Sequence, residues 1–91
     1  MLKFRTTGQF EKDYKRMQKR GKDVEKLHAV MQLLINEDAL HSHHRDHPLM
    51  GNFKDRRECH IEPDWLLIYK LSKKEKTITF ERTGSHSDIF G

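Results

Sequence analysis

Three short polar segments of this 91-residue chain carry the residue types that most often do chemistry. They are Asp46–Leu49 (DHPL), His60–Trp65 (HIEPDW) and Arg82–Phe90 (RTGSHSDIF). Each lies in an expected loop or at the end of an expected strand, where catalytic side chains often gather around a rigid sheet. The candidate catalytic residues within them are His47, His60, Asp64, Arg82 and His86.

This combination suits the cleavage of an RNA strand without a metal ion. A base removes the proton of the 2′-hydroxyl, a cation stabilises the charge that develops on the phosphate, and an acid protonates the leaving 5′-oxygen. Histidine can be base or acid near neutral pH because its unperturbed pKa is about 6.5. Arginine stays charged and offers a fixed fork of donors to phosphate oxygens. Trp65 and Phe90 offer aromatic faces on which bases can stack.

The same residues also have ordinary structural interpretations. A histidine near the end of a strand is often structural or merely exposed. Arg82 could pair with Glu81 or Asp64, and Trp65, which begins an apolar run, could belong to the core. Spacing alone leaves these alternatives open.

The chain has seven histidines, and four of them lie in one expected loop: His41, His43, His44 and His47. Imidazoles can bind zinc or nickel. No pair of cysteines and no regular histidine spacing on a helix accompanies them, so we predict no metal site and no cofactor. We assign no role to His41, His43 and His44. The single cysteine, Cys59, excludes an internal disulfide and suits a reducing cytoplasm.

Basic residues are concentrated near the N-terminus. Residues 1–26 contain nine Lys and Arg against four Asp and Glu, whereas the rest of the chain contains nine against ten. A basic segment in a small protein favours a polyanionic partner, most often nucleic acid. The candidate RNA-binding side chains are Lys12, Lys15, Lys19 and Arg20. A solvated helix face is the alternative.

Hydrophobic periodicity predicts the order β-α-α-β-β-β in one domain, residues 1–91. A strand over 2–6 precedes a helix that Thr6 or Thr7 caps and Gly21 ends. A second helix runs from Asp23 to about residue 37, and residues 38–54 are expected to be a loop. The remaining strands are predicted over 56–61, 65–71 and 77–82, with a short tail. No apolar run is long enough for a membrane span, and no signal peptide is visible.

These motifs resemble the YafQ branch of the RelE/ParE superfamily, the toxins of bacterial type II toxin–antitoxin modules. The resemblance covers nearly the whole chain, and its most specific parts are DHPL-x-G (46–51), R-x-C-H-I-E-P-D-W-L-L-I-Y (57–69) and ERTGSHSDIF (81–90). It implies an α+β, RelE-like fold with a small, mainly antiparallel sheet packed against two N-terminal helices. It also implies a cytoplasmic, ribosome-dependent endonuclease that cuts mRNA in the ribosomal A site.

The resemblance implies partners and roles as well. A cognate, DinJ-like antitoxin protein would mask the toxin, and neither a membrane nor a small-molecule ligand is expected. The active site carried over from the family comprises His47, His60, Asp64, Arg82 and His86, with Phe90 also implicated. We expect His86 to be the general acid, Asp64 or His60 the general base, and Arg82 the cation that stabilises the phosphate. His47 would hold the phosphate or assist proton transfer.

Two other functions remain open at this stage. A ParE-like toxin that inhibits DNA gyrase would share the fold but would need no acid–base residues. A non-catalytic RNA-binding module would need only the basic surface.

Overall fold

A five-stranded mixed sheet with the order β1-β5-β4-β3-β2 forms the centre of the computed structural model, which describes all 91 residues. Its strands are β1 (Lys3–Thr6), β2 (His47–Pro48), β3 (Arg57–Glu62), β4 (Trp65–Ser72) and β5 (Thr77–Gly84). The helices are α1 (Gly8–Lys19), α2 (Val24–Ile35) and α3 (His86–Phe90), with one-turn 3₁₀ helices at Ser42–His44 and Gly51–Phe53. Only β1 and β5 are parallel neighbours; every other pair is antiparallel.

The two long helices begin where the sequence predicts. The hydroxyl of Thr7 accepts the backbone N–H of Phe10 at 3.0 Å, and the carboxylate of Asp23 accepts that of Glu25 at 3.1 Å. Each bond satisfies one of the backbone donors that the first turn of a helix leaves free. Gly21 has a φ of 77°, which lets the chain turn sharply from α1 into α2.

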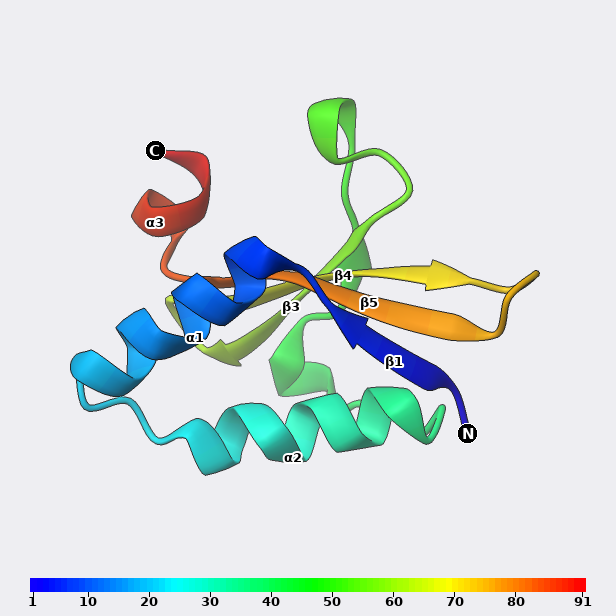
Figure 1. Cartoon of the computed structure of the whole chain (residues 1–91), viewed down its shortest axis with the longest axis horizontal. Coiled ribbons are helices and arrows are strands. Elements are labelled where there is room, and N and C mark those ends of the chain that lie inside the picture. The colour runs from blue at the N-terminus through cyan, green and yellow to red at the C-terminus, as the bar shows by residue number, and fades with distance from the viewer.

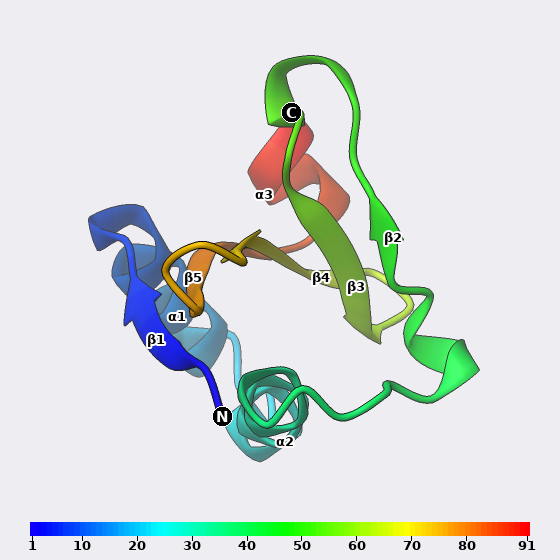
Figure 2. The ribbon, with the colours of Figure 1, turned by 90° about the vertical axis from the view of Figure 1, so that its right-hand side faces the viewer.

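The central strand β4 is buried on both faces, as its apolar sequence predicts. Trp65, Leu67 and Tyr69 point into the main core beneath α1 and α2, whereas Leu66 and Ile68 point to the opposite face. On that opposite face they pack against Ile89 of α3. Figures 1 and 2 show α2 and α3 on opposite sides of the sheet. The sheet therefore has a thick core on one side and a small cluster on the other.

The order β-α-α-β-β-β is confirmed, with additions in two places. The segment 38–54, predicted as a loop, contains β2 and both 3₁₀ turns, and the tail contains α3. β2 has only two residues, too few for any periodicity, and Pro48 is tolerated there because β2 is an edge strand. The buried part of β4 ends at Tyr69, since Lys70 and Leu71 are exposed. None of the helices has the length and apolar character that crossing a bilayer requires.

Candidate active site

His47 and His60 face one buried carboxylate, that of Glu58. β2 pairs with β3 so that His47 lies opposite Glu58, and His60 follows two residues along β3 on the same face. Nε2 of His60 is 3.3 Å from Glu58 Oε1, and Nε2 of His47 is 3.9 Å from Glu58 Oε2. The ring centroids of the two histidines are 6.5 Å apart. Glu58 is 4% exposed, so water does little to shield its carboxylate.

Backbone carbonyls set the orientation of both rings. Nδ1 of His47 lies 2.6 Å from the carbonyl oxygen of Arg45, and Nδ1 of His60 lies 3.1 Å from that of Pro63. A carbonyl can only accept, so in both rings Nδ1 must carry the proton. Each Nε2 is then free to take up a proton, and the imidazolium so formed would face Glu58.

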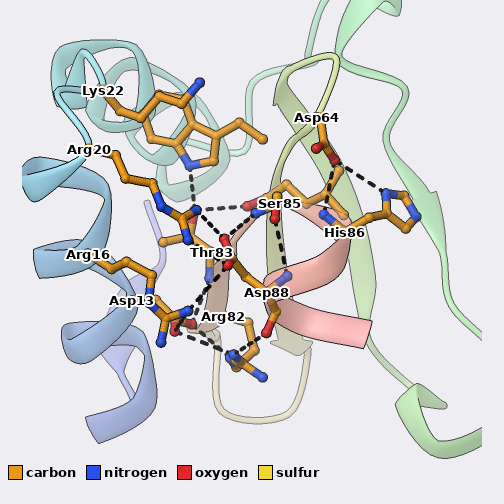
Figure 3. Close-up of polar contacts among 12 residues, drawn as sticks. Asp13, Arg16, Arg20, Lys22, Asp64, Arg82, Thr83, Ser85, His86 and Asp88 are labelled. Carbon is orange, nitrogen blue, oxygen red and sulfur yellow. Dashed lines mark hydrogen bonds and ion pairs between the residues drawn. The ribbon is translucent and has the colours of Figure 1, made fainter. Parts of the chain in front are cut away.

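His86 belongs to a second group, at the N-terminus of α3. The carboxylate of Asp64, in the turn between β3 and β4, accepts the backbone N–H of His86 at 3.0 Å and lies 3.8 Å from its Nδ1 (Figure 3). The rings of His86 and Phe90 lie one helical turn apart with centroids 5.4 Å apart, and Phe90 meets Phe53 edge-on at 5.2 Å. His86 and Phe90 both remain accessible to solvent.

Arg82 is held by a carboxylate that the sequence pattern did not single out. Its Nε donates to Asp13 of α1 at 2.7 Å, and Nη2 donates to the backbone carbonyl of Asp88 at 3.3 Å. Asp13 is fully buried and also accepts the backbone N–H of Thr83. The alternative pairing of Arg82 with Glu81 or Asp64 is therefore wrong. Nη1 of Arg82 makes no hydrogen bond within the chain.

The strand register places part of this set in one row. His47, Glu58, Ile68 and Arg82 are successive partners across β2, β3, β4 and β5. Paired residues of neighbouring strands share a face. His47 and Arg82 therefore belong to the same sheet face, the one that α3 partly covers.

Trp65 does not offer a face to RNA, contrary to the prediction. Its side chain is 0% exposed, and its indole N–H donates to the hydroxyl of Thr83 at 2.9 Å. The ammonium group of Lys22 lies 5.9 Å from the centroid of the ring. The alternative, in which Trp65 belongs to the core, is confirmed. Phe90 is the aromatic candidate that remains exposed.

The basic face of α1 divides into two parts. Lys12, Lys15 and Lys19 are exposed and make no ion pair. Arg20, in contrast, donates two hydrogen bonds to the carboxylate of Asp88, at 2.6 and 2.8 Å. The three lysines are free to bind an anionic partner, whereas Arg20 is already paired with the carboxylate of Asp88.

The histidine-rich loop lies beside the candidate site. Nδ1 of His44 donates to the carbonyl oxygen of His60 at 2.7 Å and ties the loop to β3. Nδ1 of His41 and Nδ1 of His43 are 2.6 Å apart, so one of them must donate to the other. No three His, Cys, Asp or Glu side chains of the chain are grouped as metal ligands.

Comparison with known proteins decides the family. The model of a family described as the bacterial toxin of a type II toxin–antitoxin system, YafQ, matches residues 2–91. The mRNA interferase toxin YafQ of Escherichia coli K12 is 51% identical over 86 residues, which cover 93% of this chain and 91% of that protein.

This chain belongs to the YafQ family.

Solved YafQ structures confirm the fold. The crystal structure of YafQ from E. coli BL21(DE3) superposes with a TM-score of 0.93 at 47% identity, over 100% of both chains. The structure of the E. coli DinJ–YafQ complex gives 0.92 at 48% identity, again over 100% of both chains. The expected α+β architecture is thus that of the YafQ family.

Three carboxylates of this YafQ-family chain were missed from the sequence. Alternation along β3 puts Glu58 on the same side of the strand as His60, and that shared face was the signal that could have found it. Asp88 follows Ser85 in the S-x-x-D spacing of a helix-capping box. Asp13 carries no signal, because only the packing of α1 against β5 brings it to Arg82.

Proposed function

We propose that this chain is an endoribonuclease toxin of a type II toxin–antitoxin module that cuts mRNA on translating ribosomes in the cytoplasm. The family is described as the bacterial toxin of a type II toxin–antitoxin system, and the E. coli relative is named an mRNA interferase. The arrangement of the site also supports acid–base chemistry. The observation that carries the proposal is the pair of histidines, His47 and His60, turned by backbone carbonyls toward one buried carboxylate.

His60 is the general base in this proposal. Its Nδ1 keeps its proton for the carbonyl of Pro63, so Nε2 has the lone pair that accepts the proton of the 2′-hydroxyl. Glu58, which lies 3.3 Å from the same Nε2, then stabilises the resulting imidazolium as a charged hydrogen-bond acceptor. Asp64, the other candidate base, is engaged by the backbone of His86 and acts as a positioning residue.

His86 is the general acid, and the atoms balance as follows. The 2′-oxygen attacks phosphorus, its proton passes to His60, and the bond from phosphorus to the 5′-oxygen breaks. His86, entering as the imidazolium, gives its proton to that leaving oxygen. A 2′,3′-cyclic phosphate and a 5′-hydroxyl result, and no metal ion is needed. The exposed ring of Phe90, next to His86, provides a surface on which a neighbouring base stacks.

Arg82 supplies the positive charge. The buried carboxylate of Asp13 fixes its Nε, which leaves Nη1 unbonded and pre-positioned for a phosphate oxygen. Donors held in place before the reaction stabilise developing charge without reorganisation. His47, in the same row of the sheet as Arg82, contributes a second donor to the phosphate when it is protonated.

Partners follow from charge and from the family. Lys12, Lys15 and Lys19 form a free basic strip that suits ribosomal RNA, which is bound through phosphate contacts without sequence preference. The E. coli relative has been solved in complex with DinJ, and we propose a DinJ-like antitoxin for this chain.

The test is cleavage of a defined message by the purified chain, with and without programmed ribosomes. We expect cuts in the A-site codon only when ribosomes are present, and no cuts in the free message. A parallel supercoiling assay addresses the gyrase alternative. Inhibition of gyrase with an intact message on the ribosome would overturn the proposal, as would cleavage that is indifferent to ribosomes.

A further inference from the structure

The helix that carries His86 is too short to be stable by itself. α3 has five residues, whereas isolated helices shorter than about 12–15 residues are marginal in water. Its position therefore depends on contacts with the rest of the chain. Ile89 provides one by packing against Leu66 and Ile68. An apolar contact of this kind holds the helix down but is non-directional, so polar contacts must decide how α3 is rotated about its axis.

Asp88 collects most of these polar contacts. Its carboxylate accepts both arms of the Arg20 guanidinium, lies 3.6 Å from Nη1 of Arg16, and accepts the backbone N–H of Ser85 at 2.9 Å. Its backbone carbonyl accepts a bond from Arg82. These contacts join α3 to α1 and to β5, the two elements against which it lies (Figure 3).

The close approach of Asp88 to the sheet depends on Gly84. A Cβ at Gly84 would lie 2.9 Å from Oδ2 of Asp88, and the φ of Gly84 is 153°, in the region that favours glycine. The Arg20 bonds also hold the pKa of Asp88 well below its usual range, so the carboxylate is charged at every physiological pH. A bidentate pair between two planar groups fixes orientation as well as distance.

The helical geometry of α3 relates the Arg20–Asp88 contact to the direction of the side chains of His86 and Phe90. Successive residues of an α-helix are about 100° apart, so Asp88 lies about 200° from His86, whereas Phe90 lies only about 40° from it. Figure 3 accordingly shows Asp88 directed toward α1 and His86 directed away from it, toward Asp64. The two hydrogen bonds from Arg20 to Asp88, called the Arg20 fork below, therefore hold the side of α3 opposite the one that presents His86 and Phe90.

We infer that Arg20 and Asp88 are positioning residues that set the direction of His86 and Phe90, and that Arg20 does not serve as an RNA contact. The inference rests on the proposed function for its effect on cleavage, but its structural part does not. The basic residues of α1 and its C-cap then have two separate roles, because the free lysines bind the polyanion and Arg20 aligns the general acid.

Four variants of the full chain test this inference: Arg20→Gln, Asp88→Asn, Arg20→Lys and the control Lys19→Gln. Arg20→Gln and Asp88→Asn each break the fork, and Asp88→Asn retains an oxygen that can accept the N–H of Ser85. Lys19→Gln is the matched control, because it removes one positive charge from the neighbouring, unpaired position of α1. Each protein is assayed for its single-turnover cleavage rate at saturating ribosomes and for its affinity for ribosomes.

We expect Arg20→Gln and Asp88→Asn to lower the maximal rate at least about tenfold, since misplacement of a catalytic group by about 1 Å can cost a factor of 100. Their affinity for ribosomes should change less than about twofold. Lys19→Gln should instead lower the affinity for ribosomes, with a maximal rate that changes less than about twofold. Arg20→Lys, which can restore one of the two bonds, should recover part of the rate. An Arg20→Gln protein that loses only affinity, like the control, would overturn the inference.

A second measurement needs no activity. In NMR spectra of the free protein, the cross-peaks between the ring of Phe90 on α3 and the ring of Phe53, whose centroids are 5.2 Å apart, should weaken in Arg20→Gln and Asp88→Asn and persist in Lys19→Gln. If the wild-type chain cleaves no message, the proposed function fails and this measurement alone decides the positioning role. Unchanged cross-peaks in both fork variants would overturn it.

Discussion

The carboxylate of Glu58 lies 3.3 Å from Nε2 of His60, and both side chains are nearly closed off from solvent. Glu58 makes no hydrogen bond to a backbone group and no ion pair with Lys or Arg; the groups within 4.0 Å of its carboxylate that can become positive are His60 and His47. A buried carboxylate with no other cation is costly unless a nearby group can become positive. The proposed role of His60 as general base, which would place a positive charge beside Glu58, is consistent with this relationship.

Glu58→Gln should therefore lower the rate of mRNA cleavage at least about tenfold, within the range of general acid–base groups, while the fold is kept. Glutamine has the same size but cannot stabilise the imidazolium. Single-turnover cleavage on programmed ribosomes measures the effect. Glu75→Gln, at an exposed carboxylate of the β4–β5 turn without an ion pair, is the control. Equal rates for the two variants would exclude a role for Glu58.

His86→Ala should leave the fold intact and lower cleavage by about 10²–10⁴-fold, because it removes the proposed general acid. The side chain is largely exposed, so little stability is lost. Thermal unfolding checks the fold, and translation in cells after induction checks the activity. A folded His86→Ala protein that stops translation at the wild-type rate would rule out the assignment.

Reversal of Lys12, Lys15 and Lys19 to Glu should weaken ribosome binding at least about tenfold at low salt and flatten its salt dependence, since fewer counterions are released. Co-sedimentation with ribosomes over a series of salt concentrations measures both. The same reversal at Lys73, Lys74 and Lys76 of the β4–β5 turn, with equal charge change, is the control. Unchanged binding of the α1 variant would show that this face is merely solvated.

Acid should unfold the protein partly through Asp88. The Arg20 bonds lower the pKa of this carboxyl, so the stability they add is complete above the ordinary Asp pKa of about 3.9 and is lost as pH falls below it. Melting temperatures between pH 5 and pH 2 should fall less steeply for Asp88→Asn than for the wild type. Asp55→Asn, at an exposed position without an ion pair, should follow the wild-type curve.

Trp65→Phe should destabilise the chain by about 1–3 kcal/mol, because a buried ring shrinks and the hydroxyl of Thr83 loses its indole partner. Urea unfolding measures this. The folded variant should bind ribosomes as tightly as the wild type. Phe90→Leu should show the opposite pattern, with a lower cleavage rate and little change in stability. If fully folded Trp65→Phe protein lost affinity for ribosomes, Trp65 would have to be counted among the RNA-binding residues after all.

The sequence by itself determined the order of the elements and the candidate residues. Amphipathic spacing, the caps at Thr7 and Asp23 and the apolar run of β4 are local signals, and local signals are sufficient for long helices and a central strand. The motifs around His47, His60 and His86 were also visible, since they lie in short continuous segments.

Only the tertiary structure decided how those residues are paired. Asp13 and Arg82 are 69 positions apart, and Arg20 and Asp88 are 68 apart, so no local pattern links them. Charge alone predicted that Arg20 would bind RNA, and aromatic type alone predicted the same for Trp65. In the folded chain Arg20 pairs with the carboxylate of Asp88, and Trp65 is buried in the core. Neither could be read from the sequence, because side chains distant in sequence meet only when α1, the sheet and α3 pack together.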